Sequence, residues 1–460
     1  MAQNGQKIIV LGVNHAGTSV IRTLLSQNPN AQLVAYDRND NISFLGCGIA
    51  LTVSGVVKNP ESLFYADVPA LEKMGASVKM RHEVVQIDTD AKTLVVRNLE
   101  NNEEFSDTYD VLVFAGGSWP IDPPIKNKEL DNIEICKIFQ HAKDLIAKAD
   151  DPAIKNVAVI GAGYIGIELA EAYHEKGKHV SLIDMQDRVV PRYFDTDFTD
   201  RLQQDMQSHG INLVLGAGVS EYQGVDGRVT AVVTNKGTFP ADLVIQSIGF
   251  RPNTSLLPHA EKTPNGALKV NEYMQTSIPG VYAVGDAVAI HHQATGKHEN
   301  VALATNAVKS GLVVASHING IHSLKLESVV GTNGICVFGN KLASTGLSEE
   351  AARQAGLDVA STFFSDNDRP EFMESYETVS IKLVYERETQ RLLGAQIGSY
   401  GEGNHSESIY YLALAIQKGM TLPEIAMTDV YFLPHFNKPF HFVLSALLQA
   451  MGLNYAHSGA

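Results

Sequence analysis

Cys47 is the residue whose setting best suits redox chemistry. It stands between Gly46 and Gly48 in the segment NISFLGCGIAL (residues 41–51), and the apolar stretch that follows is suited to a short helix. A sulfur at a helix N-terminus is stabilised as a thiolate, so the pattern predicts a lowered pKa for the Cys47 thiol. The alternative is a buried structural cysteine in a tight turn.

The other two cysteines, Cys136 and Cys336, are distant in sequence from Cys47 and from each other. The three form no CxxC pair and no metal-ligand spacing, so no metal site is expected. A disulfide scaffold is not expected in a reducing cytosol. Cys336, within GICVF, is predicted to be a small core residue. Two-electron storage at Cys47 would therefore use a sulfenic acid or a mixed disulfide.

A glycine-rich turn suited to a dinucleotide lies near the N-terminus. A strand is predicted over residues 7–12, the turn reads GVNHAG over residues 12–17, and an amphipathic segment extends to about residue 25. A second strand ends at Asp37. Glycine lets the backbone approach a pyrophosphate, and the helix N-terminus supplies amides and a positive dipole end. Asn14 replaces the middle glycine, so this turn alone is a weak match.

The same pattern recurs more cleanly about 150 residues later. A strand over residues 156–160 leads into GAGYIG, a helix is predicted over 167–176, and the next strand ends at Asp184. All three glycines are present, and the acidic residue falls where it can bond a ribose 2′-OH. A carboxylate repels the 2′-phosphate of NADPH, so Asp184 favours NADH. His179 and Arg188, close in sequence, could soften that preference.

Two further segments complete a family pattern. One buried strand runs into Ala115-Gly116, and another ends in Gly285-Asp286 before a helix predicted over about residues 302–318. In order and spacing the four segments resemble the pyridine nucleotide–disulfide oxidoreductases, the glutathione-reductase-like flavoenzymes. The resemblance runs from residue 7 to about residue 445. It implies FAD in the first unit, with Asp286 on the ribityl chain, and NADH in the second.

The resemblance also implies the fold class: α/β, with two Rossmann-like dinucleotide-binding domains and a C-terminal α+β dimerisation domain. The expected domains are FAD-binding (1–120 and 251–325), NAD(H)-binding (121–250) and interface (326–460). The expected FAD-binding residues are Gly12, Asn14, Ala16, Gly17, Asp37, Ala115, Gly116 and Asp286. The expected NADH-binding residues are Gly161, Gly163, Tyr164, Ile165, Gly166 and Asp184.

The segment around Cys47 resembles the single-cysteine branch of this family, which contains NADH oxidases, NADH peroxidases and coenzyme A-disulfide reductases. In the oxidases and peroxidases the first turn carries a histidine near the flavin and the sulfur. The match implies a catalytic role for His15 beside Cys47. A neutral imidazole can donate a hydrogen bond or a proton to a peroxide or a sulfenate. The alternative is that His15 only caps the helix.

The C-terminal third resembles the interface domain of the family. A capped helix is predicted from Ser348, a hairpin around residues 386–391, and apolar helices over 409–416 and 440–448. The segment FLPHFNKP (residues 432–439) resembles a stretch of NADH oxidases that reaches across a dimer toward the flavin of the other subunit. A homodimer is therefore expected.

Length and charge restrict the remaining possibilities. A chain of 460 residues predicts two or three domains. The net charge of −15 and the lack of a basic run argue against a nucleic-acid partner. No apolar stretch reaches the ~20 residues of a membrane helix, and the N-terminus does not read as a signal peptide. No membrane association and a cytoplasmic location are expected.

These features together predict an FAD-dependent, water-forming NADH oxidase, in which reduced flavin reacts with O2 and the Cys47 thiolate cycles through a sulfenic acid. NADH peroxidase and coenzyme A-disulfide reductase stay open as alternatives on the same scaffold. The reductase would need cations for coenzyme A phosphates, and Arg22 and Lys58 are candidates. A flavin-binding redox sensor without turnover is a different class, which a thiol beside the flavin disfavours.

Overall fold

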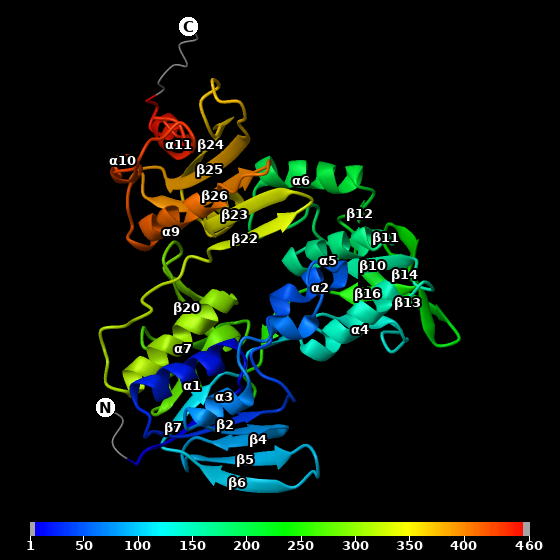
Figure 1. Ribbon diagram of the computed structural model, residues 1–460, viewed down its shortest axis with the longest axis vertical. Coiled ribbons are helices and arrows are strands. Elements are labelled where there is room, and N and C mark those ends of the chain that lie inside the picture. The colour runs from blue at the N-terminus through cyan, green and yellow to red at the C-terminus, as the bar shows by residue number, and fades with distance from the viewer. Residues whose placement is uncertain (1–4, 454–460) are drawn as a thin grey trace.

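The structure, a computed structural model, describes residues 5–453 and has three parts (Figure 1). The lower part, in blue and yellow-green, contains the first glycine turn, and the green and cyan part on the right contains the second. The upper part, in yellow to red, is the C-terminal third. Within residues 5–453, no helix combines the length and the apolar character that crossing a membrane requires.

The first part is built on a five-stranded parallel sheet, to which the chain returns late. Its strands, in pairing order, are β19 (Val281–Ala283), β7 (Val111–Phe114), β1 (Lys7–Leu11), β2 (Gln32–Asp37) and β3 (Ser77–Met80). Helices α1 (His15–Gln27) and α7 (Ala304–Ile318) lie side by side against the sheet (Figure 1). Strand β19 therefore brings Asp286 to the sheet that carries the first turn.

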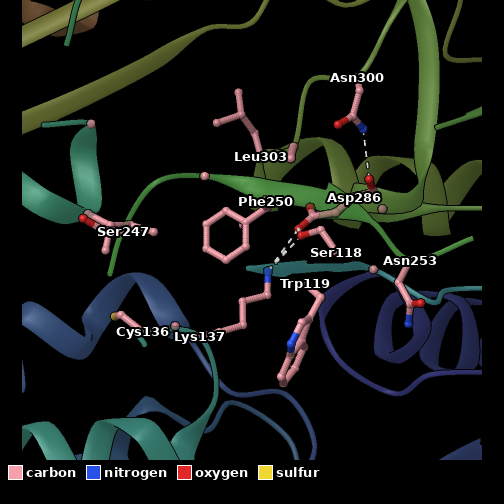
Figure 2. Close-up of a pocket in the computed structure, with 18 of the residues that line it drawn as sticks. Ser118, Trp119, Cys136, Lys137, Ser247, Phe250, Asn253, Asp286, Asn300 and Leu303 are labelled. Atoms are coloured by element: carbon pink, nitrogen blue, oxygen red, sulfur yellow. Dashed lines mark hydrogen bonds and ion pairs between the residues drawn. The ribbon is translucent and has the colours of Figure 1, made fainter. Parts of the chain in front are cut away.

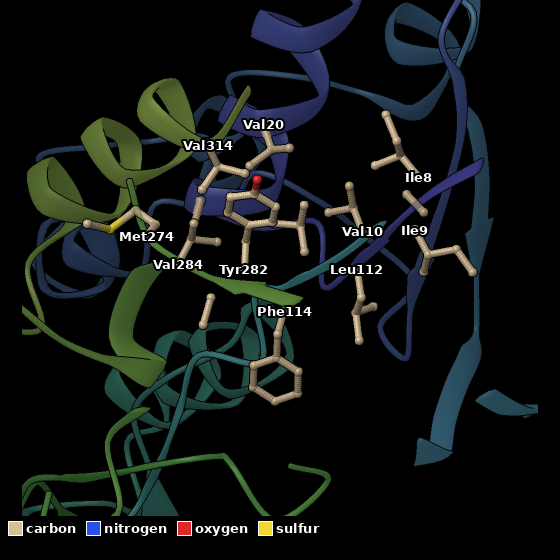
Figure 3. Packing of buried hydrophobic residues seen from close by; sticks show 14 of the residues in the cluster. Ile8, Ile9, Val10, Val20, Leu112, Phe114, Met274, Tyr282, Val284 and Val314 are labelled. Atoms are coloured by element: carbon tan, nitrogen blue, oxygen red, sulfur yellow. The ribbon is translucent and has the colours of Figure 1, made fainter. Parts of the chain in front are cut away.

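The core of this part explains the apolar run at the start of the chain. Ile8, Ile9 and Val10 are all fully buried. A parallel strand that is covered on both faces reads as a continuous apolar run rather than an alternating one. Figure 3 shows these side chains packed with Val20 of α1 and Val314 of α7.

The second part repeats the parallel arrangement. Its strands, in pairing order, are β12 (Asn212–Val214), β11 (His179–Ile183), β10 (Asn156–Ile160), β16 (Leu243–Gln246) and β9 (Ile133–Ile135). Helix α5 (Tyr164–Glu175) begins three residues before its predicted start, because the end of the glycine turn forms its first helical turn. Helix α2 (Ile49–Ser54), which follows Cys47, lies beside α5 and α4 (Phe139–Asp150) (Figure 1). The Cys47 segment thus spans the first two parts.

The C-terminal part is an antiparallel sheet with helices, which agrees with the expected α+β class. Its strands, in pairing order, are β22 (Asn333–Val337), β23 (Asn340–Gly346), β26 (Leu392–Ser399), β25 (Thr378–Glu386) and β24 (Val359–Asn367). Its helices are α8 (Glu349–Gln354), α9 (Ile409–Gln417), α10 (Leu422–Ala426) and α11 (Phe442–Ala450). Ser348 caps α8 by accepting from the Ala351 amide at 3.1 Å, and β25 and β26 form the predicted hairpin.

The remaining elements are short and connect these layers. The small antiparallel sheets comprise β4 (His82–Asp88), β5 (Thr93–Asn98), β6 (Glu104–Thr108), β8 (Ser118–Pro120), β17 (Phe250–Pro252), β13 (Val219–Val225), β14 (Arg228–Thr234), β15 (Gly237–Pro240), β20 (Val288–His292) and β21 (Lys297–Glu299). Strand β18 (Leu268–Lys269) pairs with β20, and the other helices are α3 (Val68–Lys73) and α6 (Thr196–Ser208). The domain boundaries given above stay a proposal.

The prediction of a core position for Cys336 is wrong. Cys336 is exposed, whereas its neighbours Ile335 and Val337 are buried. It lies on β22, an edge strand of the sheet, where successive side chains point to opposite faces. The apolar composition of GICVF suggested a fully buried strand, whereas one face of this strand is exposed.

A buried ion cluster joins the second part to the C-terminal part. The ammonium of Lys382, on β25, lies 2.6 Å from Asp197 of α6 and 3.0 Å from Glu349 of α8. Burial acts to raise the pKa of Glu349, but hydrogen bonds from Ser361, Arg353 and Lys382 outweigh burial and lower this pKa to about 2. Glu349 is therefore ionised across the physiological range.

This cluster predicts acid sensitivity. A carboxyl whose pKa is lower in the folded state than in the unfolded chain stabilises the fold above pH ~4.5, and this contribution is lost as the pH falls toward 2. The unfolding free energy of the wild type falls between pH ~4.5 and pH 2. We expect this loss to be about 1 kcal/mol smaller in Glu349→Gln, allowing for solvent screening. Urea unfolding at several pH values measures it, with the exposed Glu388→Gln as control. Parallel pH curves for wild type and Glu349→Gln would contradict the assignment.

Candidate active site

A cavity of about 1800 Å³ connects the two glycine turns. Side chains from all three parts of the molecule line it. Among the residues predicted to bind or react, those that line it are His15, Cys47, Gly12, Asn14, Ala16, Gly17, Asp37, Ala115, Gly116, Asp286, Gly161, Gly163, Tyr164, Ile165 and Asp184. The predicted nucleotide turns and the predicted redox residues thus share one cavity.

Gly166 is the exception. It is not among the residues that line the cavity, and a Cβ added to it would lie 1.8 Å from the Gly161 carbonyl oxygen. Its glycine is required for the close packing of α5 against the turn, which is the packing role of the third fingerprint glycine. Gly166 therefore supports the second turn through packing, and its contribution to cofactor binding stays a prediction.

The first turn needs glycine for two separate reasons. Gly12 has φ +94°, and a Cβ there would lie 2.4 Å from the Ala115 carbonyl oxygen. A Cβ on Gly17 would lie 1.9 Å from the Gly12 carbonyl oxygen. The buried Asp37 carboxylate accepts from the Val13 amide at 2.7 Å, which fixes the turn against the end of β2. The backbone is therefore held in place before any ligand binds.

The second turn leaves room where a pyrophosphate would approach. A Cβ on Gly163 would meet no atom within 4 Å, although Gly163 directly precedes α5. No side chain caps the start of this helix, and its first residues line the cavity, a setting that suits an anion. The Asp184 carboxylate accepts from the Ala162 amide at 2.5 Å and the Gln186 amide at 2.7 Å. Asp184 thus lies at the mouth of the turn.

Cys47 lies in the single 3-10 turn η1 (Gly46–Gly48), directly before α2, and is exposed. The predicted lowering of its pKa is not found. Although part of the residue is exposed, the surrounding protein partly desolvates the thiol and raises its pKa, and the Glu168 carboxylate raises it further. Helix α2 has only six residues, so its terminus offers the thiolate little stabilisation. The thiolate must therefore be formed with help from other groups.

His15 does not cap its helix. No side chain caps α1, and His15 Nδ1 instead makes a 2.9 Å hydrogen bond with the Tyr65 hydroxyl. The two rings stack with centroids 5.6 Å apart. Burial lowers the pKa of His15, so the imidazole is neutral at neutral pH and can accept or donate a proton.

Asp286 is the centre of a polar group in the same cavity (Figure 2). Its carboxylate accepts from the Ser118 hydroxyl at 2.7 Å and lies 3.3 Å from the Lys137 ammonium. The same ammonium lies 4.4 Å from the centre of the Phe250 ring. A carboxylate held by a hydroxyl and a cation at a cavity wall is a fixed point for sugar or polyol hydroxyls.

Comparison with known proteins gives the family. Residues 6–311 match the pyridine nucleotide-disulphide oxidoreductase model, and residues 332–441 match the dimerisation domain of the same family. The chain belongs to this family. It is therefore an oxidoreductase with a mixed α/β fold, as the resemblance implied.

Relatives within this family are similar over nearly the whole chain. An NADH oxidase of Mycoplasma pneumoniae is 51% identical, with 98% of each chain covered. The solved structure of the water-forming NADH oxidase from Lactobacillus brevis bound to NADH has a TM-score of 0.94 and 40% identity, covering 97% of this chain and 98% of that one. A CoA-dependent NAD(P)H sulfur oxidoreductase of Pyrococcus furiosus is 31% identical, with 94% and 96% covered.

The cavity fits the cofactors of an oxidoreductase of this family, in which FAD is typical. The first turn, Asp37 and Asp286 offer backbone amides and two carboxylates to an adenine dinucleotide with a polyol chain. The second turn and Asp184 offer the equivalent groups to a pyridine nucleotide. Because both turns open into one cavity, the reactive ends of the two cofactors can meet within it.

Several cavity residues were not predicted from the sequence. Lys137 is one; its partner Asp286 lies 149 positions away, so no local spacing marks the pair. Glu168 is another, and burial with the neighbouring Glu171 raises its pKa to about 7. Its position four residues after Tyr164 on α5 is the signal that could have placed it beside the turn.

Proposed function

We propose that this protein is a water-forming NADH oxidase that reduces O2 with four electrons from two NADH. The observation that carries the proposal is that Cys47 and His15 line the same cavity as both nucleotide turns. An oxidase that stopped at hydrogen peroxide would need the nucleotides but no thiol. The similarity to NADH oxidases supports the same activity.

FAD, when bound, supplies the chemistry that accepts hydride from NADH and reduces O2 to peroxide. The remaining steps belong to the chain. The Cys47 thiolate attacks one peroxide oxygen; an S–O bond forms, the O–O bond breaks, and hydroxide leaves to become the first water. Two electrons from a second NADH then reduce the sulfenic acid to the thiolate and release its oxygen as the second water.

Proton transfer is the task that the polar groups of the cavity can perform. His15 is neutral at neutral pH, because burial lowers its pKa. It can hold a proton for the leaving hydroxide or remove one from the Cys47 thiol, whose pKa is raised. We propose this role for His15, with Tyr65 fixing the orientation of its ring.

The stoichiometry of the reaction tests the proposal. We expect two NADH to be consumed for each O2, with no H2O2 accumulating, when an oxygen electrode, NADH absorbance and a peroxide assay are read in parallel. One NADH per O2 with equimolar H2O2 would contradict it. Anaerobic NADH oxidation by added H2O2 without any reaction with O2 would identify a peroxidase instead.

A coenzyme A-disulfide acceptor has less support. Arg22 and Lys58, the cations considered for coenzyme A phosphates, are both exposed and do not line the cavity. The relative from Pyrococcus furiosus is CoA-dependent by its name, so coenzyme A disulfide belongs among the tested acceptors. NADH-dependent release of free thiol at a rate above that with O2 would favour the reductase.

We also propose a homodimer without nucleic-acid or membrane partners, located in the cytoplasm. Apolar side chains stand exposed in and just before the segment that resembles the dimer segment of NADH oxidases, namely Met427, Val430, Tyr431, Phe432, Leu433 and Phe436. Contiguous exposed apolar surface of this kind marks an association site. Light scattering is expected to give twice the mass of 49.8 kDa. A fully active monomer would refute the proposal.

A further inference from the structure

Tyr164 is held at the cavity by two parts of the molecule at once. Its ring stacks on Tyr193 with centroids 4.4 Å apart and planes inclined by 15°. Its hydroxyl donates to Asn333 Oδ1 at the start of β22, in the C-terminal part. All three residues line the cavity. The first residue of α5 is thus tied to a different part of the fold from the one that carries the nucleotide turn.

The hydrogen bonds around Asn333 fix which end of its amide faces Tyr164. Asn333 Nδ2 donates to the Gly331 carbonyl oxygen at 2.6 Å, and a carbonyl can only accept. Oδ1 therefore faces the opposite way, where it accepts from Tyr164 and from the Ser344 hydroxyl at 3.1 Å. Burial raises the pKa of Tyr164 well above its usual value, so the phenol keeps the proton that it donates.

The position of the Tyr164 ring connects its hydrogen bond with Asn333 to nucleotide binding. Tyr164 directly follows Gly163, the open position of the second turn, and its ring lies in the cavity that connects the second turn to the first. A pyridine nucleotide bound at the second turn has to extend its reactive ring through this cavity toward the first turn. A tyrosine tied across that space competes with the nucleotide.

We propose that Asn333 is a positioning residue that ties the Tyr164 ring across the cavity, so that a pyridine nucleotide binds only after the Tyr164–Asn333 hydrogen bond breaks. The inference rests on the proposed binding of NADH at the second turn. It assigns to the C-terminal part a role in the affinity for NADH, in addition to any role in dimerisation. Binding that must first break a contact is weaker by the equilibrium constant of that contact.

The test is a double-mutant cycle on the FAD-loaded enzyme, with NAD+ as the probe. Asn333→Ala and Tyr164→Phe each remove the hydrogen bond, so each is expected to lower the Kd for NAD+ and the KM for NADH by about 2- to 10-fold, the worth of one hydrogen bond. The change should appear in KM rather than in kcat. The double variant should match either single variant, because both remove the same contact.

Thr332→Val is the matched control. Thr332 is adjacent to Asn333 and bonds Thr345 across the same hairpin at 2.8 Å, but it does not line the cavity. It should leave Kd and KM unchanged. Additive effects in the double variant, or an unchanged Kd in both single variants with FAD content intact, would overturn the inference. NAD+ affinity does not depend on the product formed from O2, so failure of the oxidase proposal would show separately, as H2O2 in the stoichiometry.

Discussion

Replacing Cys47 by serine is expected to change the product of the enzyme from water to hydrogen peroxide. Serine keeps the volume of the side chain and most of its hydrogen bonding, so folding and FAD content should change little. A serine hydroxyl is not ionised at neutral pH and is not oxidised by peroxide, so the second half of the reaction loses its nucleophile. Consumption should move from about two NADH per O2 toward one, with H2O2 appearing in matching amount.

Cys336→Ser is the matched control, because Cys336 is an exposed cysteine that does not line the cavity. It should leave the stoichiometry at two. If Cys47→Ser still made water without detectable peroxide, Cys47 would be structural and the mechanism wrong. If that variant kept its FAD but lost all activity with O2, the sulfur would act earlier in the reaction, and a disulfide acceptor would become the better interpretation.

Replacing Asp184 by alanine is expected to raise the use of NADPH relative to NADH by about 5- to 150-fold, the range of a coupling worth ~1–3 kcal/mol. Asp184 lies at the mouth of the second turn, where a carboxylate repels a 2′-phosphate. Of the two basic residues that could offset this repulsion, Arg188 is paired with Glu350 and neither it nor His179 lines the cavity.

The ratio of kcat/KM for the two nucleotides measures this preference. Asp187→Ala is the matched control, since Asp187 is an exposed acid three residues further on that does not line the cavity. It should leave the ratio unchanged. If the ratio in Asp184→Ala equals that of the wild type, another residue sets the choice of nucleotide.

The pH dependence of the second half-reaction follows from the same cavity. The pKa of Cys47 is raised by burial, and that of Glu168 is raised to about 7 by burial and by Glu171. A thiol whose pKa is raised keeps its proton at neutral pH, so peroxide reduction is expected to need a neighbouring base such as His15.

Much of the fold and of the two glycine turns could be predicted from the sequence, because these features depend on local patterns. The strands at residues 156–160 and 179–183 lie where the apolar runs indicated. Gly12 and Gly161 have positive φ and lie close to other backbone atoms. Only glycine adopts this conformation without strain, so such positions can be recognised in the sequence. The position of Cys47 directly before a short helix was readable because an apolar stretch suited to a helix follows it.

The tertiary structure alone decided the properties that depend on distant neighbours. The exposure of Cys336 depends on β22 being an edge strand, and the raised pKa of Cys47 depends on surrounding groups such as Glu168 on α5. The pairing of Lys137 with Asp286, and of Tyr164 with Asn333, joins residues separated by 149 and 169 positions. Local periodicity carries no information at such separations, because burial, charge and hydrogen bonding there are set by how the layers pack.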